Sequence, residues 1–119
     1  MGKAVPPIVY KICRAGEWGE AEKTGAFHGS EVDFMDGYIH LSAPDQVAET
    51  AAQHFAGMPD LVLVAVDGAA LGPALKWEAS RGGALFPHLY APLPLDAVVW
   101  TRPLRLGPEG RHVFPECAS

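Results

Sequence analysis

The sequence predicts an α+β domain built from short strands, turns and a few short helices. Glycine and proline, with 13 and 11 residues, make up about a fifth of the 119 residues, against a usual share of about 12%. Because proline removes a backbone donor and glycine raises the entropic cost of ordering, long helices, coiled coils and helix bundles are disfavoured. Hydrophobic residues still make up 49% of the chain, enough for a packed core and unlike a disordered tail. The length suits a single domain over residues 1–119.

The first half of the chain alternates strands with short helices. Residues 8–13 alternate with period two and include β-branched side chains, which predicts a strand. A short helix is expected over 17–24, ending at Gly25. Residues 28–37 read as a loop closed by an Asp-Gly turn, and 38–42 read as a second strand.

The clearest helix signal follows that second strand. Ser42 is expected to cap the helix, with Pro44 in its first turn and Asp45 three residues after the cap. Gly57 and Pro59 are expected to end it. Between these limits the helix would place one apolar stripe toward the core: Val47, Ala48, Ala51, Ala52 and Phe55.

The second half of the chain reads mostly as strands. Residues 61–66 are apolar at every position, which predicts a central strand buried on both faces. A short strand is expected at 75–78, and 85–90 is extended, with Pro87 confining it to an edge or a bulge. Two further strands are expected at 97–106 and 112–114.

Charge and cysteine usage exclude several classes of protein. The chain has 9 Lys and Arg against 14 Asp and Glu, a formal net charge of −5, and a duplex binder needs a basic face to replace counterions. We therefore expect no duplex nucleic-acid partner. Cys13 and Cys117 form no C-x-x-C pair and no disulfide framework, so reduced thiols in a cytoplasm are expected, with Cys13 a small buried hydrophobe.

No segment is expected to enter a membrane. The longest aliphatic run, 61–66, falls far short of the roughly 20 residues that a membrane-spanning helix needs. The start of the chain also lacks the apolar stretch of a signal peptide.

Two of the five histidines stand out by their surroundings. His28, His54 and His112 lie in loop-like or surface contexts, and no pair has the i, i+4 spacing of a helical zinc site. His40 and His88, in contrast, lie in extended apolar segments beside aromatic residues at period two. Each is either a core residue bonded to a carbonyl or part of a pocket wall that could bind a polar ligand together with tyrosines.

Ser42 and Arg81 each allow two interpretations. Ser42 is either a simple helix cap or lies beside an anion held by the free amides of the helix start. Arg81, followed by two glycines, is either a solvated loop residue or a clamp for phosphate or carboxylate.

Several motifs taken together resemble the bacterial and plant family catalogued as domain of unknown function 952. The resemblance covers nearly the whole chain and rests on Tyr10-Lys11-Ile12, Trp18, residues 36–42, Arg81-Gly82-Gly83 and residues 86–90. It implies an ADP-ribosyltransferase-like fold, a compact domain with a split, antiparallel-rich sheet and two or three short helices. In better-known proteins of that fold the sheet holds a nicotinamide dinucleotide.

The resemblance also implies roles for particular residues. Lys11 stands where the wider superfamily has a basic ligand contact on the first strand, although many family members carry histidine there. The stretch around His40 is similar to the His-Leu-Ser stretch of RNA 2′-phosphotransferases. The catalytic glutamate of many toxin-type transferases has no clear counterpart, with Glu78 as a candidate.

These observations lead to an expected cleft that binds a nucleotide-like anion such as NAD or an ADP-ribose derivative. Transfer or hydrolysis at a ribosyl or phosphoryl centre is the expected reaction class, with His40 and His88 as catalytic residues. The ligand-binding residues are expected to be Lys11, Tyr38, Ser42, Arg81 and Tyr90. The alternatives are a non-catalytic module that binds a small ligand, and a histidine-based, metal-dependent hydrolase. No residue is assigned as a metal ligand, and the oligomeric state is left open.

Overall fold

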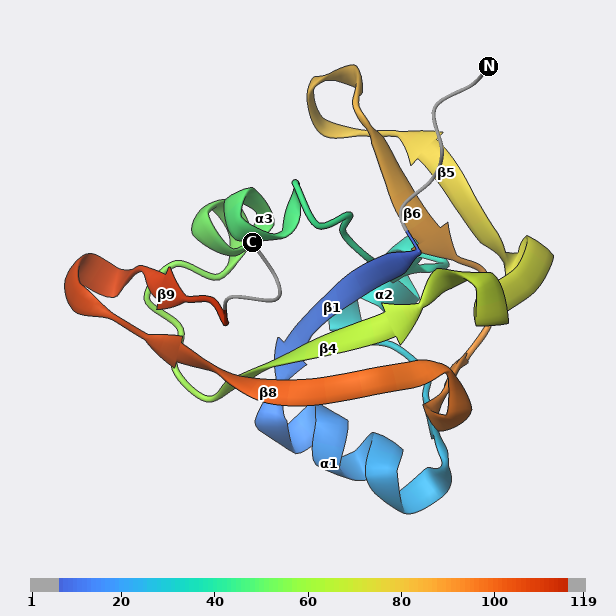
Figure 1. Ribbon diagram of the computed structural model, residues 1–119, viewed down its shortest axis with the longest axis horizontal. Helices are drawn as coiled ribbons and strands as arrows, with labels where there is room; N and C mark the ends of the chain where they lie inside the picture. The colour runs from blue at the N-terminus through green and yellow to red at the C-terminus, as the bar shows by residue number, and fades with distance from the viewer. Residues whose placement is uncertain (1–6, 116–119) are drawn as a thin grey trace.

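A curled four-stranded antiparallel sheet carries the fold of residues 7–115, the part of the chain that the computed structural model describes (Figure 1). Its strands lie in the order β1-β4-β8-β9. Their bounds are Ile8–Arg14 for β1, Leu61–Asp67 for β4, Val98–Leu106 for β8 and His112–Val113 for β9.

A smaller three-stranded sheet has the order β3-β6-β5 and forms the arm that extends at the upper right of Figure 1. Its strands are β3 (Ile39–His40), β5 (Leu75–Ala79) and β6 (Leu85–Leu89). The two sheets are joined where Tyr10 and Ser42 exchange two backbone hydrogen bonds of 2.8 and 2.9 Å.

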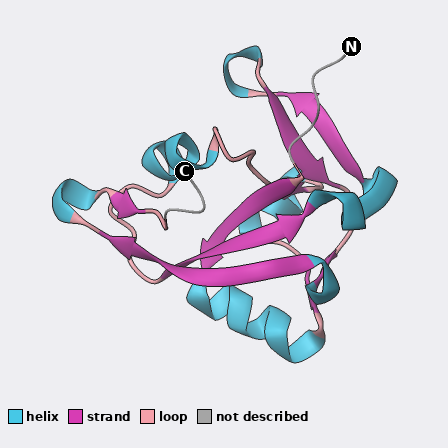
Figure 2. Cartoon of the chain, viewed as in Figure 1, coloured by secondary structure: helices cyan, strands magenta, loops and turns pink. Residues whose placement is uncertain are grey.

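Short elements complete the described chain (Figure 2). The helices are α1 (Ala15–Thr24), α2 (Glu31–Asp36) and α3 (Val47–His54), and β2 (Ala26–Phe27) pairs with β7 (Leu93–Pro94). Short 3-10 segments lie at Gly68–Ala74, which is kinked at Gly72, and at Arg81–Gly83, Leu95–Ala97 and Pro108–Gly110. The α+β class with few helices is confirmed; the ADP-ribosyltransferase-like assignment stays a prediction.

Strands β1 and β4 of the large sheet are buried on both faces, and each face has its own helix. Val9 packs with Trp18 of α1 on one face, whereas Ile12 packs with Val47 of α3 on the other. In Figure 1, α1 and α3 accordingly lie on opposite sides of β1 and β4. Residues 61–66 of β4 alternate between the two cores, so the prediction of a central strand is confirmed.

Six other sequence-based expectations are met to within a few residues. The strands expected at 8–13, 75–78, 97–106 and 112–114 and the helix at 17–24 are present, although the strand expected over 38–42 is only two residues long. Cys13 is buried, and burial raises the pKa of its thiol to about 12, as expected of a small core residue. Cys117 lies outside the described residues. Among residues 7–115, no helix could span a membrane.

The expectation of a loop over 28–37 is wrong, because α2 occupies Glu31–Asp36. The amide of Ser30 donates to Oδ2 of Asp33 at 2.9 Å, and this satisfies a donor at the start of the helix. Gly37 ends the helix in the left-handed conformation, with φ of 87°. A helix of six residues shows no apolar period long enough to recognise.

The expectation that Ser42 caps the next helix is also wrong. The helix α3 starts later, after Gln46, whose side-chain oxygen accepts the amide of Ala43 at 2.9 Å. The Ser42 hydroxyl instead donates to Oγ1 of Thr50 at 3.1 Å. The backbone N–H and C=O of Ser42 both bond to Tyr10 in the bridge between the two sheets. This pairing keeps Ser42 extended, so the helix that its sequence pattern predicts does not begin there.

Pro87 does not confine its strand to an edge, because β6 lies between β3 and β5. The Pro87 carbonyl accepts the amide of Leu41 at 3.0 Å. Since the N–H and C=O of a strand residue face the same neighbour, the missing donor of Pro87 faces the segment beyond the end of β3. Proline therefore costs this central strand one hydrogen bond, opposite Leu41, just beyond the two residue pairs of β3 and β6.

Candidate functional site

Lys11 is a buried cation in the middle of β1. The alternation of this strand turns its side chain to the same face as Val9 and Cys13, where it is only 4% exposed. Nζ donates to Oδ2 of Asp33 at 2.8 Å and to the carbonyl of His40 at 3.1 Å. Lys11 therefore acts as a counter-charge within the domain, beneath the candidate site.

Asp33 is the carboxylate that receives this cation, and it is itself almost fully buried. Besides Lys11, it accepts the amides of Ser30 and His40 at 2.9 and 3.1 Å, and Oδ1 lies 2.6 Å from Nδ1 of His40. Burial alone would raise the pKa of Asp33, but the hydrogen bond with His40 and the charge of Lys11 outweigh it and hold the pKa well below its usual range. The carboxylate is thus ionised.

Gly29 makes room for this arrangement. A Cβ atom at Gly29 would lie 2.9 Å from Cβ of Asp33, and the residue has φ of +124°. We expect Gly29→Ala to lower the free energy of unfolding, measured in urea, by about 2 kcal/mol more than Gly25→Ala. Gly25 is the matched control because it also has positive φ, at +91°, but open space around it. Equal losses for both variants would show that the contact with Asp33 imposes no constraint.

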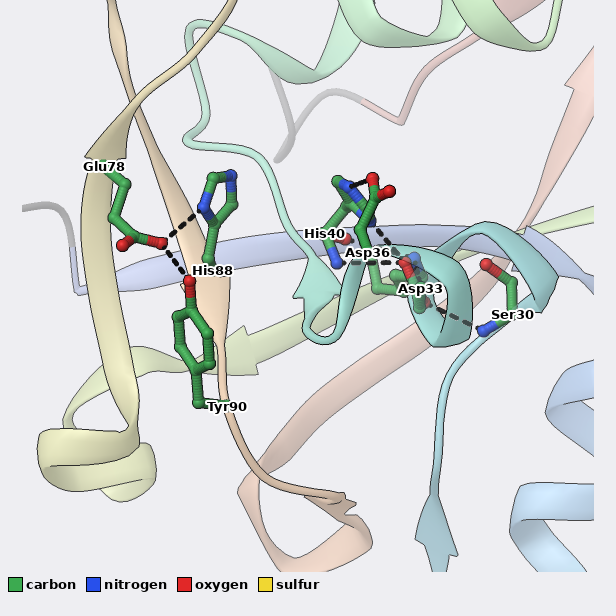
Figure 3. Close-up of polar contacts among 8 residues, drawn as sticks. Ser30, Asp33, Asp36, His40, Glu78, His88 and Tyr90 are labelled. Carbon is green, nitrogen blue, oxygen red and sulfur yellow. Dashed lines mark hydrogen bonds and ion pairs between the residues drawn. The ribbon is translucent and has the colours of Figure 1, made fainter.

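His40 has a carboxylate on each ring nitrogen. Nδ1 faces Asp33, and Nε2 lies 2.9 Å from Oδ2 of Asp36 (Figure 3). An ionised carboxylate only accepts hydrogen bonds, so each contact needs a ring N–H as its donor, and both bonds form together when the ring carries both hydrogens. The two carboxylates differ in exposure: the side chain of Asp33 is 1% exposed and that of Asp36 is 50% exposed.

His88 has a carboxylate partner of its own on the neighbouring strand. Oε1 of Glu78 lies 2.8 Å from Nδ1 of His88 and accepts the Tyr90 hydroxyl at 2.6 Å (Figure 3). These hydrogen bonds, that of Tyr90 first, lower the pKa of Glu78, and the bond to Glu78 raises the pKa of Tyr90 to about 12. Among the described residues, Nε2 of His88 has no hydrogen-bond partner.

The rings of Tyr38, His40, His88 and Tyr90 form one group, called here the four-ring cluster. Tyr38 stacks on His88 with centroids 4.1 Å apart and lies 4.7 Å from His40 and 5.3 Å from Tyr90. The pairing of His40 opposite His88 between β3 and β6 brings the two imidazoles to 5.9 Å. Burial, followed by the charges of Asp36 and Glu78, raises the pKa of Tyr38.

The structure thus brings together four of the seven residues predicted for the site. Lys11 lies beneath the cluster and is linked to His40 through Asp33. Ser42 is buried, with its hydroxyl on Thr50. The backbone of Arg81 forms a 3-10 turn, whereas its side chain lies outside the described part of the structure.

The sequence reasoning missed Asp33 and Asp36 as partners of the site. Asp33 carried one local signal, its position three residues after Ser30, which is typical of a helix start. In the sequence, the Asp36-Gly37 pair predicts only a turn. Glu78 is a candidate only through the family resemblance, and the structure pairs it with His88 and Tyr90.

Two surface hollows of the protein lie away from the four-ring cluster. One surface hollow is lined by residues 14–16 and 58–60, and another lies along α1 beside Phe27 and Gly29. Neither is lined by the four-ring cluster. Within residues 7–115, no three His, Cys, Asp or Glu side chains are arranged to hold a metal ion.

The fold and the cluster together define a class: a small α+β domain in which two carboxylate–imidazole pairs flank a stacked tyrosine. The model of the family described as "Protein of unknown function (DUF952)" matches residues 12–101, and the chain belongs to this family. This confirms the family resemblance found in the sequence.

Solved structures of one bacterial protein share the fold. The crystal structure of protein CC0527 from Caulobacter crescentus is 51% identical, covers 89% of this chain and 93% of its own, and has a TM-score of 0.87. The solution NMR structure of CC0527 is 51% identical, covers 89% and 91%, and has a TM-score of 0.80. No match was found among curated proteins.

Proposed function

We propose that this protein binds a nucleotide-like ligand of the NAD or ADP-ribose class at the four-ring cluster and catalyses transfer or hydrolysis at a ribosyl or phosphoryl centre of it. The observation that supports this proposal is the pair of imidazoles 5.9 Å apart, each with a carboxylate on Nδ1. A carboxylate in this position orients an imidazole and selects its tautomer. Tyr38 and Tyr90 add faces on which a flat ring can stack.

The two histidines have different roles in this proposal. With Nδ1–H of His88 donating to Glu78, Nε2 becomes an acceptor. His88 therefore takes a proton from the attacking water or hydroxyl at Nε2 and returns it to the leaving group. His40 has both nitrogens engaged by carboxylates, so it contributes positive charge rather than proton transfer.

A non-catalytic module that binds the same ligands is the second candidate. The observation that favours it is that His40 already has a partner on each nitrogen, which leaves His88 as the single imidazole poised for proton transfer. A metal-dependent hydrolase has no comparable support, since no three donor side chains converge within residues 7–115.

The experiment combines ligand binding with turnover and uses His88→Asn. The amide of asparagine can replace Nδ1–H toward Glu78 but supplies no base in the place of Nε2. A ligand at a hundred times its Kd should stabilise the wild-type protein by about 2.7 kcal/mol. We expect NAD or ADP-ribose to produce such a shift in both proteins, and His88→Asn to lower turnover by about 10²- to 10⁴-fold.

The matched control is His28→Asn, at an exposed position outside the cluster, which should change neither binding nor turnover. Binding without turnover by the wild-type protein would favour the non-catalytic module. Absence of any thermal shift with NAD, ADP-ribose and nicotinamide would contradict the proposed ligand class.

A further inference from the structure

The two carboxylates that contact His40 differ in burial and in the number of their hydrogen-bond partners. Asp33 is buried and makes four contacts, with Lys11, the Ser30 amide and two nitrogens of His40. Asp36 is half exposed, and its carboxylate contacts Nε2 of His40 at 2.9 Å. Asp36 is also the last residue of α2, directly before the left-handed Gly37. Asp33 is therefore a fixed partner and Asp36 a removable one.

The charges beneath the ring favour one further anion if Asp36 moves away. Lys11 and Asp33 compensate each other across 2.8 Å. When the His40 ring carries both hydrogens, loss of Asp36 leaves it with one uncompensated positive charge and one free N–H at Nε2. A phosphate oxygen accepts such a charge-assisted hydrogen bond as readily as a carboxylate oxygen does.

We propose that Asp36 occupies an anion-binding position on Nε2 of His40, and that an incoming phosphate-type oxyanion displaces it. The exchange is inexpensive because a half-exposed ion pair contributes little to stability, whereas the same exchange at Asp33 would leave Lys11 without its partner. Asp36 thus acts as an internal competitor of the ligand. This inference rests on the proposed function in taking the oxyanion to be a phosphate of the nucleotide-like ligand.

The test measures binding of inorganic phosphate and of ADP-ribose to the wild-type protein, Asp36→Ala and Glu31→Ala at pH 6, by NMR of the histidine ring nitrogens. Glu31 is the matched control because it is an exposed acid on the same helix and its removal changes the net charge equally. We expect Asp36→Ala to bind phosphate about tenfold more tightly than the wild type, with the largest shift at Nε2 of His40. Glu31→Ala should retain the wild-type Kd.

A second variant checks that the gain arises at His40. Adding His40→Gln to Asp36→Ala should return the Kd for phosphate to that of Glu31→Ala or weaker. If Asp36→Ala and Glu31→Ala bind phosphate equally, or if the gain survives His40→Gln, the inference is wrong.

The two probes separate this inference from the proposed function. Tighter phosphate binding by Asp36→Ala, without binding of ADP-ribose or NAD to either protein, would support the anion position and contradict the proposed ligand class. Equal binding of ADP-ribose to wild type and Asp36→Ala would support the ligand class and overturn the role of Asp36.

Discussion

Lys11→Met should lower the free energy of unfolding by about 3–5 kcal/mol, as expected when one partner of a buried ion pair is removed. Methionine keeps most of the apolar stem but removes the ammonium group that lies 2.8 Å from Asp33. Asp33 then remains as a buried carboxylate that has lost its buried ammonium partner and keeps only the partly exposed His40 ring at 2.6 Å, which is unfavourable. Urea denaturation followed by circular dichroism measures the loss.

Two comparisons isolate the ion pair. Combining Lys11→Met with Asp33→Asn should cost less than the sum of the two single variants, because neither member of the Lys11–Asp33 pair is then left buried without the other. Lys23→Met removes an exposed cation 3.9 Å from Glu20 and should change stability by less than about 1 kcal/mol. A loss for Lys11→Met as small as that for Lys23→Met would show that Asp33 does not depend on Lys11.

The stability of the protein should fall in acid in a way that depends on Asp33. Its pKa is lower in the folded state than the value of about 3.9 in an unfolded chain. Between these two values the unfolded state binds more protons, so the contribution of Asp33 is fully present above about pH 4 and is lost as the pH falls. We expect a loss on the order of 2 kcal/mol from this group.

Urea denaturation at a series of pH values between 6 and 2 measures this dependence. Asp33→Asn should be less stable at pH 6 and show a flatter acid limb. Asp45→Asn, which removes an exposed carboxylate, should keep the wild-type slope. An acid limb unchanged in Asp33→Asn would contradict the assignment of the depressed pKa to this residue.

The strands could be predicted where their signal is local. The alternation of residues 8–13 and the apolar run 61–66 reflect burial that each segment shows by itself. In contrast, α2 depends on Asp33, whose bonds to Lys11 and His40 arise only after folding. The apolar residues of α2, Val32, Phe34 and Met35, are exposed and its buried residue is Asp33, so the usual pattern of a helix with an apolar face toward the core is reversed.

The same distinction applies to the site. Tyr38-x-His40 and His88-x-Tyr90 were recognised because period-two spacing places both rings of each pair on one face of a strand. Their carboxylate partners were not, since Glu78 reaches His88 only through the pairing of β5 with β6. At Ser42 a local signal predicts too much. Its sequence pattern predicts a helix cap, but the pairing with Tyr10, which is distant in sequence, places Ser42 in the bridge between the sheets.

In each carboxylate–imidazole pair the two residues are close in the sequence, so the site consists of two short segments, called here modules, that each contain a complete pair. Asp33 and His40 are 7 residues apart, and Glu78 and His88 are 10 apart, so each pair belongs to one short stretch of chain with a low entropic cost of closure. The two modules meet through the register of β3 and β6, which comprises two residue pairs. Substitutions within one module can therefore change the hydrogen bonding of its own histidine without changing the carboxylate partner of the other. A slip of one residue in that register, in contrast, would turn one ring to the opposite face of the sheet and separate the two histidines.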